Sequence, residues 1–127
     1  IYIMAGIYGS EKKLDDCIII NEKGFITETI SSNIFLIKDK FILTPPLIDG
    51  PVAGIMRKQI LKIADMLQYR IYNEKSLTEK NIIDADEMFL TNSITGIKWV
   101  LAFKEKRFFN NSSQQFIDKL NEIAFKK

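Results

Sequence analysis

The chain has 127 residues, of which 46% are hydrophobic, and its formal net charge is +2 at pH 7. This length and apolar content are sufficient for one globular domain with a hydrophobic core. The scattered charges do not indicate a nucleic-acid surface. The absence of histidine and the single cysteine exclude histidine-activated nucleophiles, an internal disulfide and the usual zinc sites.

The first segment, residues 1–8, is apolar and predicts a helical segment. It lacks the basic start of a signal peptide and is too short to span a membrane, so we expect no membrane partner. Because the chain begins with Ile1 rather than with methionine, we expect it to be part of a longer protein.

Strand signals follow. Residues 17–21 and 25–28 predict two strands joined across a turn, and Cys17 in the first of them is expected to be a buried strand residue. Residues 33–43 predict a second hairpin, with its turn at Lys38-Asp39.

The hydrophobic spacing becomes helical after Gly54, where apolar residues recur at three or four positions and predict an amphipathic helix to about Gln68. Residues 70–73 predict a brief strand. The pattern Ser76-Leu77-Thr78-Glu79 matches a capping box and predicts a short helix that ends near Ala85.

The last part of the chain predicts strands at residues 87–91 and 97–103 on either side of a turn at residues 92–96. A final helix is expected from Ser112, where Gln115 gives a box-like start. Its expected buried face consists of Phe116, Leu120, Ile123 and Ala124.

Three polar clusters interrupt these elements, at residues 28–33, 44–57 and 91–96. In the second cluster a Pro/Gly-rich loop opens directly into the helix after Gly54. The first amides of a helix lack intrahelical partners and lie at the positive end of its dipole, so this junction could hold a phosphate. The third cluster could form an anion-binding turn. Each cluster also has an ordinary interpretation as turn, helix cap or connecting loop, and we expect the three to converge.

A set of residues along the chain carries a distinctive order and spacing. These residues are Glu28, Ser31-Ser32-Asn33, Thr44-Pro45-Pro46-Leu47, Gly54-Ile55-Met56-Arg57, Ala85-Asp86-Glu87, Asn92-Ser93, Gly96-Ile97 and Val100. They strongly resemble the C-terminal domain of class IV pyridoxal-phosphate enzymes, the group of branched-chain and D-amino-acid aminotransferases and aminodeoxychorismate lyase. The resemblance implies an α/β fold, a mixed-sheet pseudo-barrel with flanking helices, and a single C-terminal cofactor-binding domain over residues 1–127.

The resemblance also implies a pyridoxal-phosphate site. Glu28 matches the carboxylate that keeps the cofactor ring nitrogen protonated, which favours the electron-sink chemistry of this cofactor. The amides of Ile55 and Met56, which follow Gly54, match groups that hold the cofactor phosphate, as does the hydroxyl of Ser93.

Three further residues match positions close to the cofactor or substrate. Val52 matches an apolar side chain against the cofactor ring, and Ser31 matches a hydroxyl that bonds near the cofactor in the D-amino-acid branch. Ile94 matches a position whose backbone receives the substrate carboxylate in aminotransferases.

Two groups that the family uses are expected outside this chain, namely the Schiff-base lysine and an arginine of the smaller N-terminal domain. Lys12, Lys13 and Lys23 have charged, turn-like surroundings and are expected to be solvated rather than catalytic. We therefore expect this segment alone to be inactive, within a parent protein that is a cytoplasmic homodimer.

Two positions favour the lyase branch. Met56 stands where many aminotransferases have threonine, and Asn92-Ser93 stands in place of a Gly-Thr pair. The leading interpretation is an aminodeoxychorismate lyase of folate biosynthesis, which eliminates pyruvate to give 4-aminobenzoate. The first alternative is a branched-chain or D-amino-acid aminotransferase, and the second is a non-catalytic binding domain that retains the fold. A small amino substrate is expected in the enzymes. Trp99, which replaces a proline usual in the family, has no interpretation.

Overall fold

Five strands precede the first α-helix in the described part of the chain. The computed structural model describes residues 3–8, 14–29, 32–51, 54–93, 96–104 and 106–124, which hold ten β-strands, three α-helices and one 3-10 helix. In chain order these are β1 (Ile3–Tyr8), β2 (Leu14–Ile20), β3 (Ile26–Thr29), β4 (Asn33–Lys38), β5 (Phe41–Leu43), η1 (Leu47–Asp49), α1 (Ile55–Met66), β6 (Arg70–Tyr72), α2 (Glu79–Asp84), β7 (Glu87–Asn92), β8 (Gly96–Trp99), β9 (Ala102–Phe103), β10 (Lys106–Arg107) and α3 (Asn111–Ala124).

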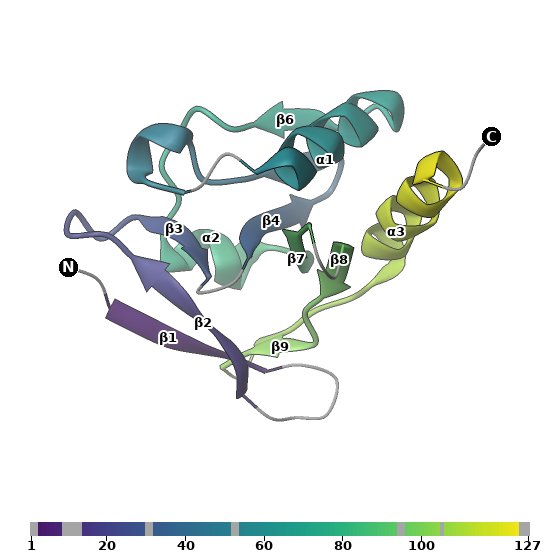
Figure 1. Ribbon diagram of the computed structural model, residues 1–127. Helices are drawn as coiled ribbons and strands as arrows, with labels where there is room; N and C mark the ends of the chain where they lie inside the picture. The colour runs from purple at the N-terminus through teal and green to yellow at the C-terminus, as the bar shows by residue number, and fades with distance from the viewer. Residues whose placement is uncertain are drawn as a thin grey trace.

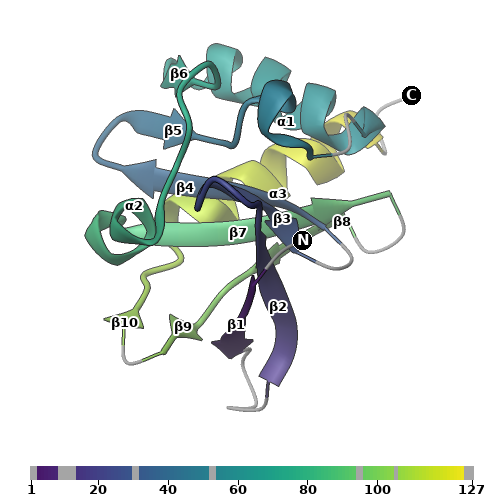
Figure 2. The ribbon, with the colours of Figure 1, turned by 90° about the vertical axis from the view of Figure 1, so that its left-hand side faces the viewer.

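The strands form two sheets of five strands each within the described residues. The first has the order β10-β9-β1-β2-β3 and is antiparallel throughout. The second has the order β6-β5-β4-β7-β8 and is mixed, because β5 and β6 run parallel. Helices α1 and α3 cover one side of the second sheet, and the first sheet lies on its other side (Figures 1 and 2). The predicted mixed-sheet α/β fold with flanking helices is confirmed.

Alternation along the strands gives the second sheet a core on each side. The even-numbered residues Ile34, Leu36, Met88 and Leu90 pack with Ile18, Ile26 and α2, between the two sheets. The odd-numbered residues Phe35, Ile37 and Phe89 pack with α1 and α3 in a second cluster. The rings of Phe35 and Phe89 stack at 5.2 Å between centroids. Side chains that stand opposite one another on β4 and β7 therefore point to the same side of the sheet. The odd-numbered positions of both strands face α1 and α3.

The prediction of a helical segment over residues 1–8 was wrong, because Ile3–Tyr8 forms strand β1. It pairs with β2 from Ile3 opposite Ile20 to Tyr8 opposite Leu14, and with β9. A short apolar run fits a buried strand as well as a helix, and pairing partners distant in sequence decide between them. Cys17 lies in β2 as predicted, although the burial of its side chain lies outside what the structure describes.

The strand predicted at residues 97–103 is divided between the two sheets. Strand β8 continues the second sheet beside β7, whereas β9 pairs with β1 in the first. The amide of Val100, between them, donates to the Met88 carbonyl at 2.8 Å. The chain therefore crosses from one layer to the other within the mostly apolar run that predicts one continuous strand.

Two predicted helix caps and one turn were also wrong. Thr78 and Asn81 form the capping box of α2, instead of Ser76 and Glu79. The first hairpin of the second sheet turns at Asp39 and Lys40, one residue later than predicted, and Asp39 has the left-handed φ of 54°.

The start of α3 is held from outside the helix. The Glu87 carboxylate accepts bonds from the amides of Ser112 and Ser113, so the cap comes from β7 instead of Gln115. On this helix Phe116 is buried and Leu120 half-buried as predicted, but Ile123 is 40% exposed because α3 extends past the sheet there. The side chain of Ala124 lies outside the described part. None of the described helices combines the length and apolarity needed to cross a membrane.

Candidate functional site

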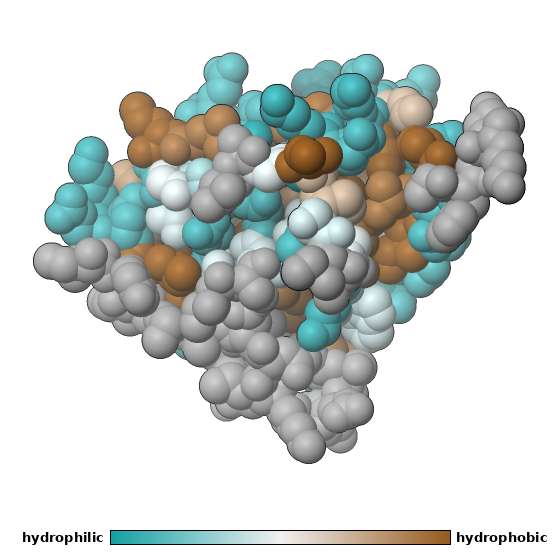
Figure 3. Space-filling view, viewed as in Figure 1, coloured by the Kyte–Doolittle hydropathy of each residue, from teal (hydrophilic) through white to brown (hydrophobic). Residues whose placement is uncertain are grey.

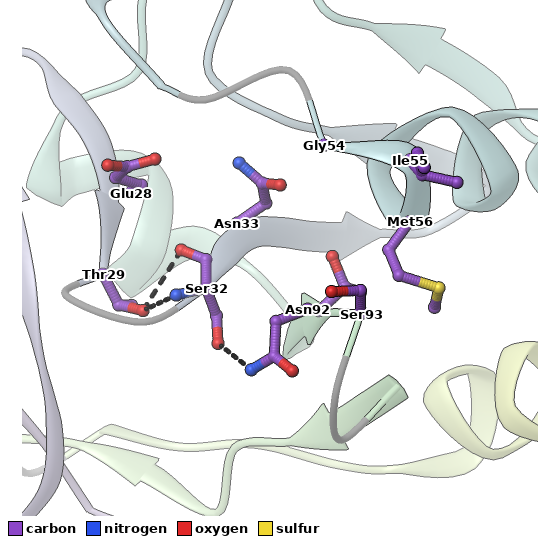
Figure 4. A pocket seen from close by; sticks show the side chains of 10 residues that line it. Glu28, Thr29, Ser32, Asn33, Gly54, Ile55, Met56, Asn92 and Ser93 are labelled. Carbon is purple, nitrogen blue, oxygen red and sulfur yellow. Dashed lines mark hydrogen bonds between the residues drawn. The ribbon is translucent and has the colours of Figure 1, made fainter.

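One pocket gathers residues from the three polar clusters. Its volume is about 310 Å³, and it opens where the ends of β3 and β7 and the start of β4 meet the N-terminus of α1. Its lining residues are Glu28, Thr29, Ser32, Asn33, Gly54, Ile55, Met56, Thr91, Asn92 and Ser93 (Figure 4). The centre of the face that carries it is mostly pale in hydropathy, and apolar residues lie above and to its left, near η1 (Figure 3).

The N-terminus of α1 forms one wall of the pocket. Gly54 is the N-cap residue, has extended φ and ψ of −71° and 161°, and provides no side-chain acceptor. The first intrahelical bond runs from the Lys58 amide to the Gly54 carbonyl at 3.4 Å. The amides of Ile55 and Met56, in the first turn, thus have no intrahelical acceptor. They lie at the positive end of the helix dipole, which attracts anions.

A buried positive charge reinforces this wall. Arg57, in the first turn of α1, is 6% exposed, and its Nη2 donates to the Pro45 carbonyl at 3.2 Å. Burial lowers the pKa of Arg57, but a guanidinium starts so high that it stays charged at neutral pH. Its charge adds to the positive potential at the helix start.

The connection between β3 and β4 forms the opposite wall. Thr29 accepts a hydrogen bond from the Ser32 amide at 2.9 Å and donates to the Ser32 carbonyl at 3.1 Å. Asn92, at the end of β7, donates through Nδ2 to Ser32 Oγ at 3.0 Å. These bonds, drawn in Figure 4, tie the loop after Glu28 to the loop that carries Ser93.

The charged and hydroxyl groups are separated across the pocket. Figure 4 shows the half-buried carboxylate of Glu28 at one end, and Met56 and exposed Ser93 at the other. Asn33 and Ser32 lie between them. The pocket therefore offers amides and a hydroxyl for an anion at one end and a carboxylate for a cationic or protonated group at the other.

The structure brings five of the eight predicted site residues into this pocket, namely Glu28, Gly54, Ile55, Met56 and Ser93. The other three, Ser31, Val52 and Ile94, lie outside the described residues, as do Lys12 and Lys13. Lys23 is exposed in the turn before β3, as predicted. The functional roles of all eight site residues stay predictions.

The pocket also includes residues absent from the predicted site. They are Thr29, Ser32, Asn33, Thr91 and Asn92. All of them belong to the first and third polar clusters, and strand alternation could have singled out Asn33 and Thr91. These two stand opposite each other in the register of β4 and β7, two residues beyond the stacked Phe35 and Phe89 on the same face.

The donor set fits a phosphate ester. Thr91 is 1% exposed, and its Oγ1 has no hydrogen-bond partner within the described structure although it borders the pocket. A Cβ atom on Gly54 would lie 3.5 Å from Asn33 Oδ1, in ordinary van der Waals contact, so the start of α1 lies directly beside the Asn33 side chain. An uncapped helix start, an unpaired buried hydroxyl and an exposed serine are together suited to phosphate oxygens.

Known proteins share this fold and sequence pattern. The profile of the amino-transferase class IV family matches residues 1–103. A protein of Thermotoga maritima, assigned as a branched-chain amino-acid aminotransferase, is 34% identical over 94 residues, which cover 74% of this chain and 34% of that relative. A solved structure from Legionella pneumophila, assigned as a 4-amino-4-deoxychorismate lyase, is 36% identical with a TM-score of 0.79, covering 86% of this chain and 41% of the other.

A third similarity concerns the fold alone. An aminotransferase from Brucella abortus, solved with pyridoxal phosphate bound, has a TM-score of 0.82 at 21% identity, over 90% of this chain and 41% of that one. The mixed sheet with its helix-bounded pocket and the family match lead to one conclusion: the chain belongs to the class IV aminotransferase family. It spans about a third of the length of the curated relatives it matches.

Proposed function

We propose that this chain is the cofactor-binding domain of a pyridoxal-phosphate enzyme, and that the full-length protein is an aminodeoxychorismate lyase. The observation that carries the cofactor assignment is the polarity of the pocket. An uncapped helix start and the Ser93 hydroxyl lie at one end, and the Glu28 carboxylate lies at the other. The Brucella abortus aminotransferase, which has the same fold, was solved with pyridoxal phosphate bound.

At the anionic end, the Ile55 and Met56 amides would hold the phosphate as fixed dipoles, and Ser93 would add a hydroxyl donor. The buried charge of Arg57 stabilises the same anion through space. Because these groups belong to a helix and a strand end, they need little rearrangement to bind, which favours affinity.

At the other end, Glu28 would hold a proton on the ring nitrogen through a charge-assisted hydrogen bond. Pyridoxal phosphate, when bound, supplies an electron sink for carbanion chemistry, which works best with that nitrogen protonated. The half-buried position of Glu28 on β3 keeps this carboxylate in the pocket wall rather than in bulk solvent. The role of this chain is therefore to orient the cofactor and to maintain its charge state.

The choice of a lyase rests on Asn92 and Met56. The Asn92 amide bonds to Ser32 Oγ across the pocket wall, an interaction that the glycine of the Gly-Thr pair cannot make. Met56 contributes an amide but no hydroxyl at the helix start. The Legionella relative supports the lyase, whereas the Thermotoga relative supports a branched-chain aminotransferase, which stays the second candidate.

We place the Schiff-base lysine and part of the substrate pocket in the remainder of a homodimeric, cytoplasmic protein. Consequently, the whole activity is assigned to the full-length protein and not to these residues by themselves.

The two reactions differ in what they consume. Full-length protein with aminodeoxychorismate should release pyruvate and an aromatic amine without consuming a keto-acid acceptor, and a coupled assay measures the pyruvate. A parallel reaction with a branched-chain amino acid and a keto-acid acceptor should give no exchange, because the lyase needs no second substrate. Rapid transamination without pyruvate release would instead establish the second candidate, and absence of both reactions would favour a non-catalytic binding domain.

A further inference from the structure

The most unusual polar group outside the predicted site is the hydroxyl of Thr91. The side chain is 1% exposed, yet Oγ1 has neither a donor nor an acceptor among the described residues. Leaving a buried hydroxyl without a partner costs free energy, since its bonds to water are lost without replacement. An isosteric valine at this position would avoid that cost, so the retained hydroxyl indicates a partner that the described residues do not provide.

The surroundings of Thr91 leave one direction for such a partner. On β4 the residue opposite is Asn33, and on β8 it is Ile97. Along the same face of β7 the next residue is Phe89, which is fully buried and stacked on Phe35. The remaining side is the pocket, which Thr91 lines together with Gly54 and Ser93.

The position lies beneath the start of α1. A Cβ on Gly54 would be 3.5 Å from Asn33 Oδ1, and Asn33 is the cross-strand neighbour of Thr91. Helix α1 and these two residues share the layer that contains Phe35 and Phe89. The unpaired hydroxyl and the uncapped amides of Ile55 and Met56 thus border the same end of the pocket.

Two other buried threonines show what a structural hydroxyl looks like in this fold. Thr44 is 2% exposed and donates to the Ile34 carbonyl at 2.6 Å. Thr29 is fully buried and bonds both the amide and the carbonyl of Ser32. Both are satisfied within the protein, in contrast to Thr91.

We propose that Thr91 is a ligand-binding residue of this pocket, whose hydroxyl donates a hydrogen bond to an oxygen of the phosphate group held at the N-terminus of α1. This inference rests on the proposed function, because it takes the phosphate ester of pyridoxal phosphate as the anion. It adds a donor from the floor of the pocket to the amides and to Ser93. An anionic oxygen satisfies the hydroxyl, and the bond is charge-assisted.

The test uses the full-length protein, prepared without cofactor, as wild type and as Thr91→Val, Thr91→Ser and Thr44→Val variants. Affinities for inorganic phosphate and for pyridoxal phosphate are measured by calorimetry, and thermal denaturation is followed without ligand. Thr91→Val should bind both probes about 10- to 100-fold more weakly, the usual effect of losing a hydrogen bond to a charged group. Its melting temperature without ligand should equal or exceed that of wild type.

The control variants separate binding from structure. Thr91→Ser retains the hydroxyl and should bind close to wild type, while Thr44→Val should lower the melting temperature and leave both affinities unchanged. Equal phosphate affinity in wild type and Thr91→Val would overturn the assignment, as would a lower melting temperature of ligand-free Thr91→Val with unchanged binding. Failure of the wild type to bind pyridoxal phosphate would overturn the proposed function instead, whatever the variants do.

Discussion

The carboxylate of Glu87 provides the sharpest stability prediction. It is 4% exposed on β7, and its Oε1 accepts bonds from the amide and hydroxyl of Ser113 at 2.7 and 2.8 Å. Its Oε2 accepts the Ser112 amide at 2.8 Å. A negative charge at the first turn of α3 also interacts favourably with the positive end of the helix dipole. We therefore expect Glu87→Gln to loosen α3 from the sheet.

The magnitude follows from the three bonds. Glutamine retains one carbonyl oxygen, which could still accept from Ser113, but as a neutral acceptor. Its NH₂ group faces the Ser112 amide, so two donors oppose each other and that amide loses its partner. The substitution converts charge-assisted bonds to neutral ones and removes one acceptor. Together these changes should reduce the stability of α3 by about 2–4 kcal/mol. Since bonds in one network are not additive, we do not expect the full sum of three separate bonds.

Hydrogen–deuterium exchange of the α3 amides in the full-length protein measures this loss locally. Exchange should accelerate by about 30- to 900-fold, the ratio that corresponds to 2–4 kcal/mol. Glu79→Gln is the matched control, since Glu79 pairs at 3.1 Å with Lys104 at the surface, where ion pairs contribute about 0–1 kcal/mol. If α3 exchanges at the same rate in both variants, the Glu87 carboxylate does not hold this helix.

Three further predictions concern the cofactor. Glu28→Gln should still bind pyridoxal phosphate but lower kcat by about 10²- to 10³-fold, as when one electrostatic stabiliser is removed; a nearly normal kcat in steady-state assays would remove Glu28 from the mechanism. Ser93→Ala should weaken cofactor binding by about 1.5–3 kcal/mol in a titration, and Met56→Thr should tighten it if the new hydroxyl faces the phosphate. Unchanged affinity in Ser93→Ala would exclude the serine from the phosphate site.

Much of the fold could be predicted because its signals are local. The period of apolar residues after Gly54 identifies α1, and the two continuous apolar runs within residues 33–43 identify a hairpin. The α2 cap and the turn at Asp39 and Lys40 are local shifts of one or two residues, whereas the larger failures involve partners distant in sequence. Strand β1 depends on β2 and β9 for its hydrogen bonds, and α3 depends on a carboxylate of β7. Neither partner is visible in a window of neighbouring residues.

The residues of the candidate site also fall into a part that the sequence predicts and a part that it does not. Polar clusters at strand ends and a Gly-containing helix start are sequence features, and together with the resemblance to class IV pyridoxal-phosphate enzymes they led to Glu28, Gly54, Ile55, Met56 and Ser93. Strand alternation could have placed Thr91 beside Asn33, but its significance could not be found in this way, because it lies in the lack of a hydrogen-bond partner among the described residues. The sequence around a threonine near a turn does not reveal whether its hydroxyl is hydrogen-bonded, as in Thr29, or unpaired, as in Thr91.

The chain topology explains why separate clusters meet. Strands β4 and β7 are antiparallel neighbours, so the start of β4 at Asn33 and the end of β7 at Asn92 lie at the same edge of the sheet. Strand β3 ends only a few residues before β4 begins, which brings Glu28 to that edge, and α1 begins above Asn33. The pocket is thus a consequence of strand order, and the bond from Asn92 to Ser32 fixes two of its loops to each other. Sequence changes in these loops can therefore alter the ligand chemistry while the sheet beneath them retains its two apolar cores.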